Sequence, residues 1–197
     1  LHTSFGLRVE SIDGESNGYL AQTVQSNSDT VVLPGAGVFY QITPKLGLLA
    51  GVNKGFVPNS PGEESDIEPE ESWNYEIGLR ASVADWRIEA IGFFNDYSNL
   101  KGSCTFSSGC NTQLDEEFNG GEVDIFGAEF SANGKFVFTN GLELPIKIAY
   151  THTQSEFQTS FDSNFSQWGN VTAGDELPYL PENQFNLQIG LAGEKWQ

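Results

Sequence analysis

Apolar and polar side chains alternate along much of this chain, most clearly between residues 73 and 94. In the first half of that segment the apolar positions are Tyr75, Ile77, Leu79, Ala81 and Val83, and they alternate with Asn74, Glu76, Gly78, Arg80 and Ser82. A period of two puts the two sets on opposite faces of a β-strand. After Ala84-Asp85 the alternation resumes, with Trp86, Ile88 and Ala90 opposite Arg87 and Glu89. The pattern predicts a hairpin with one apolar face and one charged face.

The alternation recurs often enough to predict roughly eight strands. We expect them near residues 2–13, 31–43, 46–57, 73–83, 86–100, 122–136, 142–157 and 185–191. Long polar connections (14–30, 58–72, 101–121 and 158–181) alternate with short turns at 43–45, 84–86 and 138–141. An antiparallel up-and-down meander would therefore have every long loop at one end. Transmembrane β-barrels of bacteria have this asymmetry, whereas period-two alternation alone also fits a half-buried soluble sheet.

Composition favours strands over membrane helices. The chain has 197 residues, of which 38% are hydrophobic and 22 are glycine. No run approaches the roughly 20 apolar residues of a membrane helix, while a membrane strand needs only about 9 to 11. The formal net charge is −18 with 9 Lys and Arg residues, which argues against nucleic acid as a partner.

Aromatic residues gather near the ends of the predicted strands. They are Trp73, Trp86, Tyr97, Tyr150 and Phe157. Such positions are typical of the aromatic girdles at the two membrane interfaces. Ordinary packing in a core or at a sheet edge explains them equally well.

The sequence contains no recognisable catalytic or metal-binding motif. Cys104 and Cys110 lie in a polar stretch without a nearby histidine, so we expect a local disulfide worth about 2 kcal/mol, formed in an oxidising compartment. His2 and His152 stand apart from other candidate ligands. A nucleophile elbow, a phosphate loop and a zinc signature are all missing from the sequence. We therefore predict no metal, no cofactor and no enzymatic activity.

Four longer motifs follow one another along the chain, at residues 48–58 (LLAGVNKGFVP), 67–80 (IEPEESWNYEIGLR), 118–129 (FNGGEV with GAE) and 175–184 (DELPYLPENQ). In this order they resemble the barrel of TonB-dependent outer-membrane receptors, and within them the ferric-dicitrate receptor type. Each is weak alone, but together they span essentially the whole chain. The resemblance implies a bacterial outer-membrane location and import of a ferric chelate through a 22-stranded barrel filled by an N-terminal plug domain.

From this resemblance we expect residues 1–197 to be about eight strands of a larger barrel, without the plug domain and the TonB-contacting segment. The chain would supply barrel wall and extracellular loops for uptake of a ferric siderophore or a similar iron chelate. Its expected partners are the ferric chelate, outer-membrane lipid and, through the missing plug domain, the TonB complex.

Two sets of residues are candidates for function. We expect the charged strand positions to face the lumen, because a charge facing lipid near the midplane costs about 2 to 4 kcal/mol. These positions are Arg8, Glu10, Glu76, Arg80, Arg87 and Glu89. In a soluble sheet they would face solvent.

The second set lies in the long loops, where aromatic rings can stack on a chelate and a cation can bind its carboxylates. The candidates are Lys101, Phe165, Trp168 and Tyr179. Loop packing explains the aromatic residues at least as well. The loops are otherwise acidic, notably at 63–71 and 115–117, so they do not support citrate specificity.

Two other architectures remain open on the sequence. A small, complete outer-membrane barrel with an adhesive or structural role would pair the first strand with the eighth. A soluble, secreted β-sandwich would fold without detergent. Strand order and closure separate these possibilities.

Overall fold

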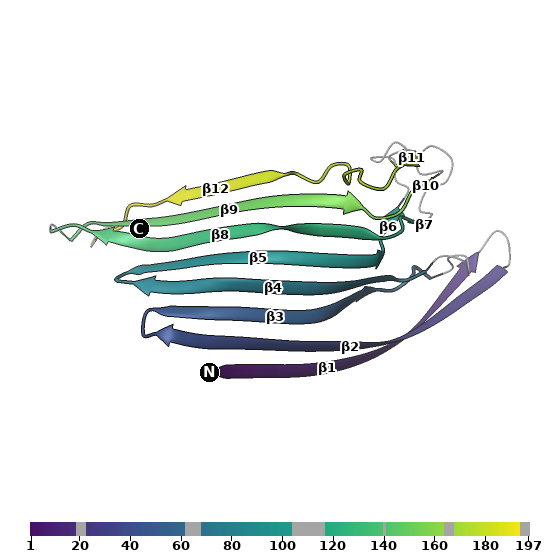
Figure 1. Ribbon diagram of the computed structural model, residues 1–197, viewed down its shortest axis with the longest axis horizontal. Coiled ribbons are helices and arrows are strands. Elements are labelled where there is room, and N and C mark those ends of the chain that lie inside the picture. Colours follow the sequence, from purple (N-terminus) through teal and green to yellow (C-terminus); the bar gives the residue numbers. More distant parts are fainter. Residues whose placement is uncertain (19–22, 62–67, 104–116, 140, 164–167, 194–197) are drawn as a thin grey trace.

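The computed structural model is all-β, and it describes residues 1–18, 23–61, 68–103, 117–139, 141–163 and 168–193. Its main element is an eight-stranded antiparallel sheet with the order β1-β2-β3-β4-β5-β8-β9-β12 (Figure 1). The strands are β1 (His2–Gly18), β2 (Thr23–Thr43), β3 (Leu46–Val57), β4 (Glu70–Val83), β5 (Trp86–Asn99), β8 (Val123–Val137), β9 (Glu143–Phe157) and β12 (Asn183–Ile189). The predicted meander is confirmed.

The connections are sorted as the sequence predicts. The turns β2–β3, β4–β5 and β8–β9 lie at one end of the sheet, and the long connections lie at the other (Figure 1). Two small sheets lie at the long-loop end: β6 (Lys101–Ser103) pairs with β7 (Glu117–Asn119), and β10 (Phe161–Asp162) pairs with β11 (Asn170–Val171). Among the described residues, no helix is long and apolar enough to cross a membrane.

The first two strands are longer than predicted. Residues 14–18 continue β1 and residues 23–30 begin β2, so most of the predicted loop 14–30 is a paired ribbon, with Asp13 opposite Ser28. The pairing of β2 with β3 begins at Gly35, so the ribbon extends beyond its neighbour. The ribbon residues are almost all polar, so the ribbon has no apolar side and alternation does not reveal it. One of its faces contacts the β3–β4 connection, where Asn27 Nδ2 donates to the Asn59 and Ser60 carbonyl oxygens at 3.4 and 3.5 Å.

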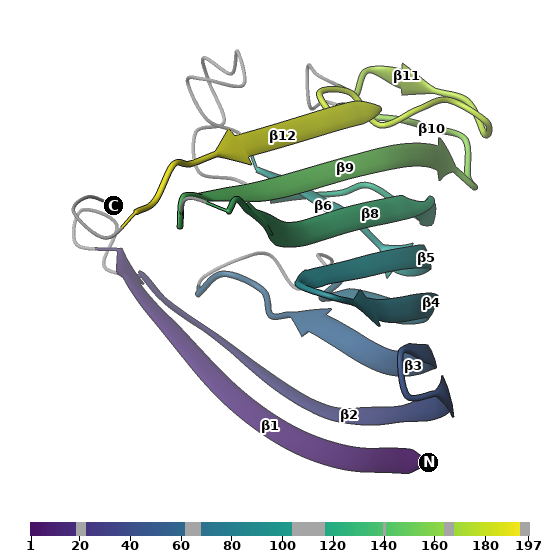
Figure 2. The same cartoon turned by 90° about the vertical axis from the view of Figure 1, so that its left-hand side faces the viewer.

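The main sheet curves but does not close. Figure 2 shows it as an arc with β1 and β12 at opposite edges, and no pairing between these two strands is present in the described residues. A complete eight-stranded barrel would require that pairing. A sandwich would require a second sheet of similar size facing the first, and the two smaller sheets have only two strands each. The arc is therefore a portion of the wall of a larger barrel.

Strand register extends the apolar face across seven strands. One row of directly opposed residues contains Tyr40, Leu48, Leu79, Ala90, Phe130, Tyr150 and Phe185. The next residue along each of five strands faces the other way and forms the row Arg80, Glu89, Ser131, Ala149 and Asn186. The apolar face is open to its surroundings, and Ile77 is 60% exposed. An apolar surface of this extent is too large for a water-soluble monomer and fits contact with lipid.

Candidate functional site: the barrel wall and its loop cluster

The apolar band has the height of a bilayer core. Trp73 and Val83 mark its two ends on β4, and ten residues of strand cover about 34 Å, or about 24 Å at a tilt of 45°. At the long-loop end, a row formed by Trp73, Asp96, Asp124 and Glu156 ends the apolar band on four adjacent strands. At the short-turn end, the Trp86 and Phe136 rings pack edge to face with centroids 5.3 Å apart. Trp73 and Trp86 thus occupy the two interfaces.

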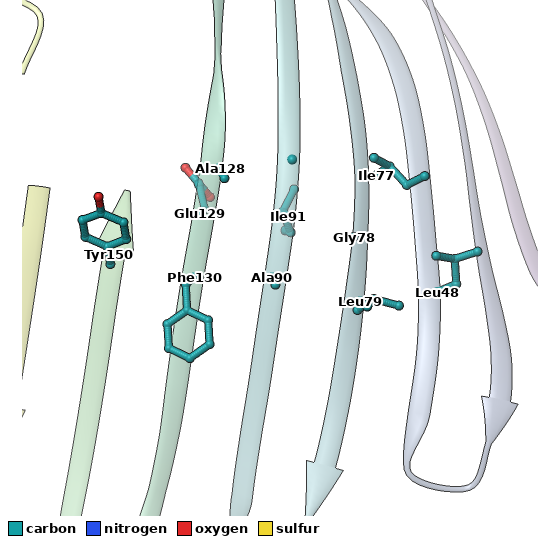
Figure 3. A pocket seen from close by; sticks show the side chains of 11 residues that line it. Leu48, Ile77, Gly78, Leu79, Ala90, Ile91, Ala128, Glu129, Phe130 and Tyr150 are labelled. Carbon is teal, nitrogen blue, oxygen red and sulfur yellow. The ribbon is translucent and has the colours of Figure 1, made fainter. Parts of the chain in front are cut away.

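Figure 3 shows the middle of this band. Phe130 and Tyr150 lie on one side, Ile77 and Leu79 lie on the other, and small side chains such as Ala90 lie between them. The resulting depression is apolar. It belongs to the same surface as the rest of the band, and acyl chains can follow such an uneven surface because they are fluid.

The six charged strand residues expected in the lumen all lie on the face opposite the apolar band, as register requires. Arg80 Nε donates a hydrogen bond to Glu89, and the Arg80 guanidinium carbon lies 5.8 Å from the centroid of the Phe39 ring. Arg8 forms an ion pair with Glu10 on the neighbouring part of the sheet. Glu76 and Arg87 share this polar face. The face therefore carries charges that are partly neutralised by one another.

Tyr97 and Phe157 do not belong to an aromatic girdle. Both point to the polar face, and both pack in a small apolar core at the long-loop end. Phe157 is only 1% exposed and shares this core with Val123 and Val171. The residues packed around it are Tyr97, Leu100, Ile125, Phe161, Trp168 and Leu177. For these two aromatics, ordinary packing is the correct interpretation. Tyr150 lies in the middle of the apolar band and does not mark an interface either.

Trp168 is part of the same loop cluster. Its ring centroid lies 6.2 Å from that of Phe157 and 5.9 Å from that of Phe161, and both pairs are edge to face. Gly120 lies under this ring, because a Cβ at position 120 would collide with Trp168 and lie 2.5 Å from the Leu100 carbonyl oxygen. Gly121 has a φ of +67°, which favours glycine. The Gly-Gly pair thus allows the last long loop to pack against the preceding one.

Lys101 is buried in the loop cluster, so the structure does not support its predicted contact with a chelate. The Lys101 Nζ lies 2.8 Å from Glu117 Oε2, and it also donates to the Pro58 carbonyl oxygen at 2.9 Å and Asn59 Oδ1 at 3.3 Å. Its side chain is 6% exposed. All three ammonium donors therefore have protein partners, which leaves none for a ligand.

Glu117 completes this network. Ser60 Oγ donates to Glu117 Oε1 at 2.6 Å. Burial raises the pKa of the Glu117 carboxyl, but hydrogen bonds from Lys101 and Ser60 together with the Lys101 charge outweigh burial and leave the pKa below its usual value. The carboxylate therefore stays ionised and holds the loop at 58–60 against β6 and β7.

Tyr179 differs from Trp168 because its ring is free. It is 84% exposed, and its φ of +63° is unusual for a residue other than glycine. Pro178 and Pro181 flank it and restrict the backbone on both sides. Phe165, Cys104 and Cys110 lie outside the described residues. Sequence reasoning did not single out Lys147 or Asn133, although Lys147 alternates with Ile146 and Ile148 and so belongs to the polar face.

Within the described ranges, no group of three or more His, Cys, Asp or Glu side chains is arranged to hold a metal ion. The features that do stand out are a wall with one apolar and one polar face, a band about as high as a bilayer core, and a packed cluster of long loops at one end. These define a strand-built segment of a transmembrane β-barrel.

Comparison with known proteins identifies the family. Residues 1–197 match the family model described as "TonB dependent receptor-like, beta-barrel", so the chain belongs to this family. Barrels of this family lie in the bacterial outer membrane, which is the location of this chain. Among curated proteins, the chain is 33% identical over 75 residues to the metal-pseudopaline receptor CntO of Pseudomonas aeruginosa, an alignment that covers 37% of this chain and 11% of CntO.

Solved structures share the fold. The unliganded ferric citrate transporter FecA aligns with a TM-score of 0.69 and 19% identity over 95% of this chain and 27% of FecA. The siderophore receptor PiuA of Acinetobacter baumannii aligns with a TM-score of 0.68 and 18% identity over 94% of this chain and 28% of PiuA. The chain therefore spans only about a tenth of its curated relative and about a quarter of these receptors.

Proposed function

We propose that this chain supplies barrel wall and extracellular loops to a receptor that imports a ferric siderophore or a similar metal chelate across the outer membrane. The observation that carries this proposal is the sorting of the sheet: one face is apolar across seven strands, the other is polar, and every long loop lies at one end. FecA is a ferric citrate transporter, PiuA is a siderophore receptor and CntO is a metal-pseudopaline receptor, so all three handle a metal chelate or its chelator.

In this proposal the apolar band contacts outer-membrane lipid and the polar face contacts the lumen. Arg8, Glu10, Glu76, Arg80, Arg87 and Glu89 then remain in water or against protein, which avoids about 2 to 4 kcal/mol for each charge that would otherwise face the bilayer midplane. In this proposal the chain forms part of the barrel wall, and its loops contact the chelate. Its relatives are transporters and receptors, and we propose no catalytic role for it.

Tyr179 is the described residue best placed to contact a chelate, because its ring is exposed at the long-loop end and its backbone is restricted by two prolines. Phe165 is a second candidate. Acidic side chains at this end, including Glu68, Glu122 and Glu176, disfavour a chelate with net negative charge. Together with the burial of Lys101, this makes citrate an unsuitable ligand for these loops and favours a neutral or cationic chelate.

Energy for transport would come from the TonB complex through a plug domain of the parent receptor. We propose that residues 1–197 contain barrel wall and its extracellular loops, and that the plug is a separate part of the same receptor. Outer-membrane lipid, the chelate and TonB are then the three partners of the intact protein, and nucleic acid is not one of them.

The test is uptake of a ⁵⁵Fe-labelled chelate by cells that carry the intact parent receptor under iron limitation. We expect uptake to be lost when the receptor gene is deleted, to return on complementation and to be lost again when TonB is removed. Uptake that continues without TonB would contradict the proposal. Adhesion of the same strains to a surface serves as the control. If the protein were an adhesive barrel, deletion of its gene would change adhesion and leave iron uptake unaltered.

A further inference from the structure

A row of hydrogen-bond donors crosses the polar face near the short-turn end. Strand register places Ser82, Arg87, Asn133, Lys147 and Gln188 directly opposite one another on β4, β5, β8, β9 and β12. Each of these side chains can donate a hydrogen bond, and none carries a negative charge. The row lies one residue pair away from the β4–β5 turn, because the next pair is Val83 with Trp86.

The row keeps two uncompensated positive charges. Neighbouring cations are already paired: Arg80 with Glu89, and Lys135 with Glu143 at 2.6 Å. Arg87 and Lys147 are exposed and form no ion pair with any described residue. Asp85, in the adjoining turn, is also exposed and forms no ion pair with Arg87 or Lys147. Both cations are thus available to an external group.

The surface is hollowed on both sides of Asn133. A cavity of about 530 Å³ is lined by Arg80, Ser82, Arg87 and Glu89, and an adjacent one of about 300 Å³ is lined by Lys147, Asn186 and Gln188; Ser131 and Asn133 line both. Two strand spacings separate the backbones of Arg87 and Lys147, which is about 10 Å. Both long side chains can therefore reach one anion above Asn133.

We propose that this row is an anion site on the lumen wall and that it binds a carboxylate. The Arg87 guanidinium can bind a carboxylate through two parallel hydrogen bonds, Lys147 adds a compact charge, and the Asn133 amide can donate from below. The carboxylate has two possible sources: a small molecule in transit, or an Asp or Glu side chain of another part of the receptor inside the lumen. The site itself depends only on the barrel topology. Binding of a small molecule in transit depends on the proposed function as well, whereas binding of an Asp or Glu side chain does not.

The position of the site gives it a distinct role from the loops. The connections at the long-loop end carry exposed acidic side chains, among them Glu68, Glu122 and Glu176. A carboxylate is therefore repelled at that end and attracted to the cations at the opposite end of the wall. The charge distribution favours binding of a carboxylate at the short-turn mouth of the lumen.

The test compares the intact parent receptor in detergent with the double variant Arg87→Gln/Lys147→Gln. Lys45→Gln is the matched control, because Lys45 is an exposed cation in the β2–β3 turn at the same end and has no ion pair among the described residues. Citrate is titrated calorimetrically at low and high salt. In parallel, a carbodiimide links Lys147 to any carboxylate in contact with it, and the linked peptides are identified by mass spectrometry. Retained heat-modifiable mobility shows that each variant is folded.

Citrate binding that weakens with salt, and weakens at least about tenfold in the double variant but not in Lys45→Gln, supports a site for small carboxylates. A cross-link from Lys147 to an Asp or Glu outside this sheet, without citrate binding, supports the same site with a protein carboxylate. The absence of both citrate binding and such a cross-link would overturn the proposal. If citrate binding or the Lys147 cross-link is observed but TonB-dependent uptake is not, the proposed function is refuted while the anion site remains supported.

Discussion

Lys101 and Glu117 form an ion pair that fastens the two short strands β6 and β7 at the long-loop end, with Nζ 2.8 Å from Oε2 and the side chains 6% and 12% exposed. The pair lies where a chelate-binding cation was expected, and it serves the loop structure instead. Through Pro58, Asn59 and Ser60 it also connects the β3–β4 connection to this cluster. The loops above the wall are thus held by contacts among themselves.

Replacing Lys101 with Met should open this cluster. Breaking one partner of a buried pair costs about 3 to 5 kcal/mol because the remaining charge stays buried. We expect faster hydrogen exchange at Ser103, Glu117 and the neighbouring strand amides, while the wall strands keep their protection.

The matched control is Lys54→Met. Lys54 pairs with Glu71 at 2.7 Å, but Glu71 is a more exposed partner, and such pairs contribute at most about 1 kcal/mol. Equal loss of protection in the two variants would contradict the role given to Lys101.

The loop cluster should loosen in acid. The pKa of Glu117 is lower in the folded loop than its usual value of 4.5, so its contribution to stability is complete above that value and is lost as the pH falls through the lowered pKa. Hydrogen exchange corrected for its intrinsic pH dependence should show loss of protection in β6 and β7 below about pH 4.5. Glu117→Gln should remove this pH dependence. An unchanged acid response in Glu117→Gln would assign it to other carboxylates.

Gly120→Ala should disturb the packing of two long loops. The added Cβ would meet the Trp168 ring and the Leu100 carbonyl oxygen, and the backbone oxygen cannot turn aside as a flexible side chain can. Overpacking of this kind costs about 1 to 3 kcal/mol. We expect lower exchange protection at Leu100, whose N–H donates to the Gly121 carbonyl oxygen at 2.9 Å.

Gly6→Ala is the control for this change, because a Cβ at Gly6 would have no atom within 4 Å. It should leave protection at Leu100 unchanged. If Gly120→Ala also leaves that amide unchanged, the close approach of Trp168 does not limit the packing of these loops.

Tyr179→Ala should weaken binding of the iron chelate by the intact receptor. Loss of one stacked ring predicts roughly a two- to tenfold rise in Kd, measured by fluorescence titration. Tyr179→Phe should bind like the parent protein, since the ring is retained. Phe138→Ala is a suitable control because this exposed aromatic residue lies at the opposite end of the wall. A Kd unchanged by Tyr179→Ala would remove Tyr179 from the ligand-binding surface.

The sequence predicts the wall better than the loops, for physical reasons. The bounds of β3 and the two faces of β4 follow from local alternation, because each strand has lipid-compatible and polar sides. Alternation fails for the ribbon near Gly14, because its residues are polar on both faces. The position of Tyr97 near a strand end wrongly suggests an aromatic girdle. Its even spacing from Arg87 and Glu89 already puts it on the charged face of the strand.

The role of Lys101 depends on partners that are distant in sequence. Glu117 lies 16 residues away and Asn59 lies 42 residues away, so only folding brings these groups together. The row from Ser82 to Gln188 is likewise visible only after the register of five strands is known. Periodicity gives the face of each residue, but the pairing of strands determines its neighbours.

The central claim is that one face of the sheet meets lipid and the other meets the lumen. A nitroxide scan of residues 75–80 in the intact receptor, reconstituted in a bilayer, tests it most directly. We predict that accessibility to oxygen is highest at Tyr75, Ile77 and Leu79, and that the relative accessibility to a water-soluble nickel complex is highest at Glu76 and Arg80. The same alternation with opposite phase, or no alternation along the strand, would contradict the assignment of the two faces.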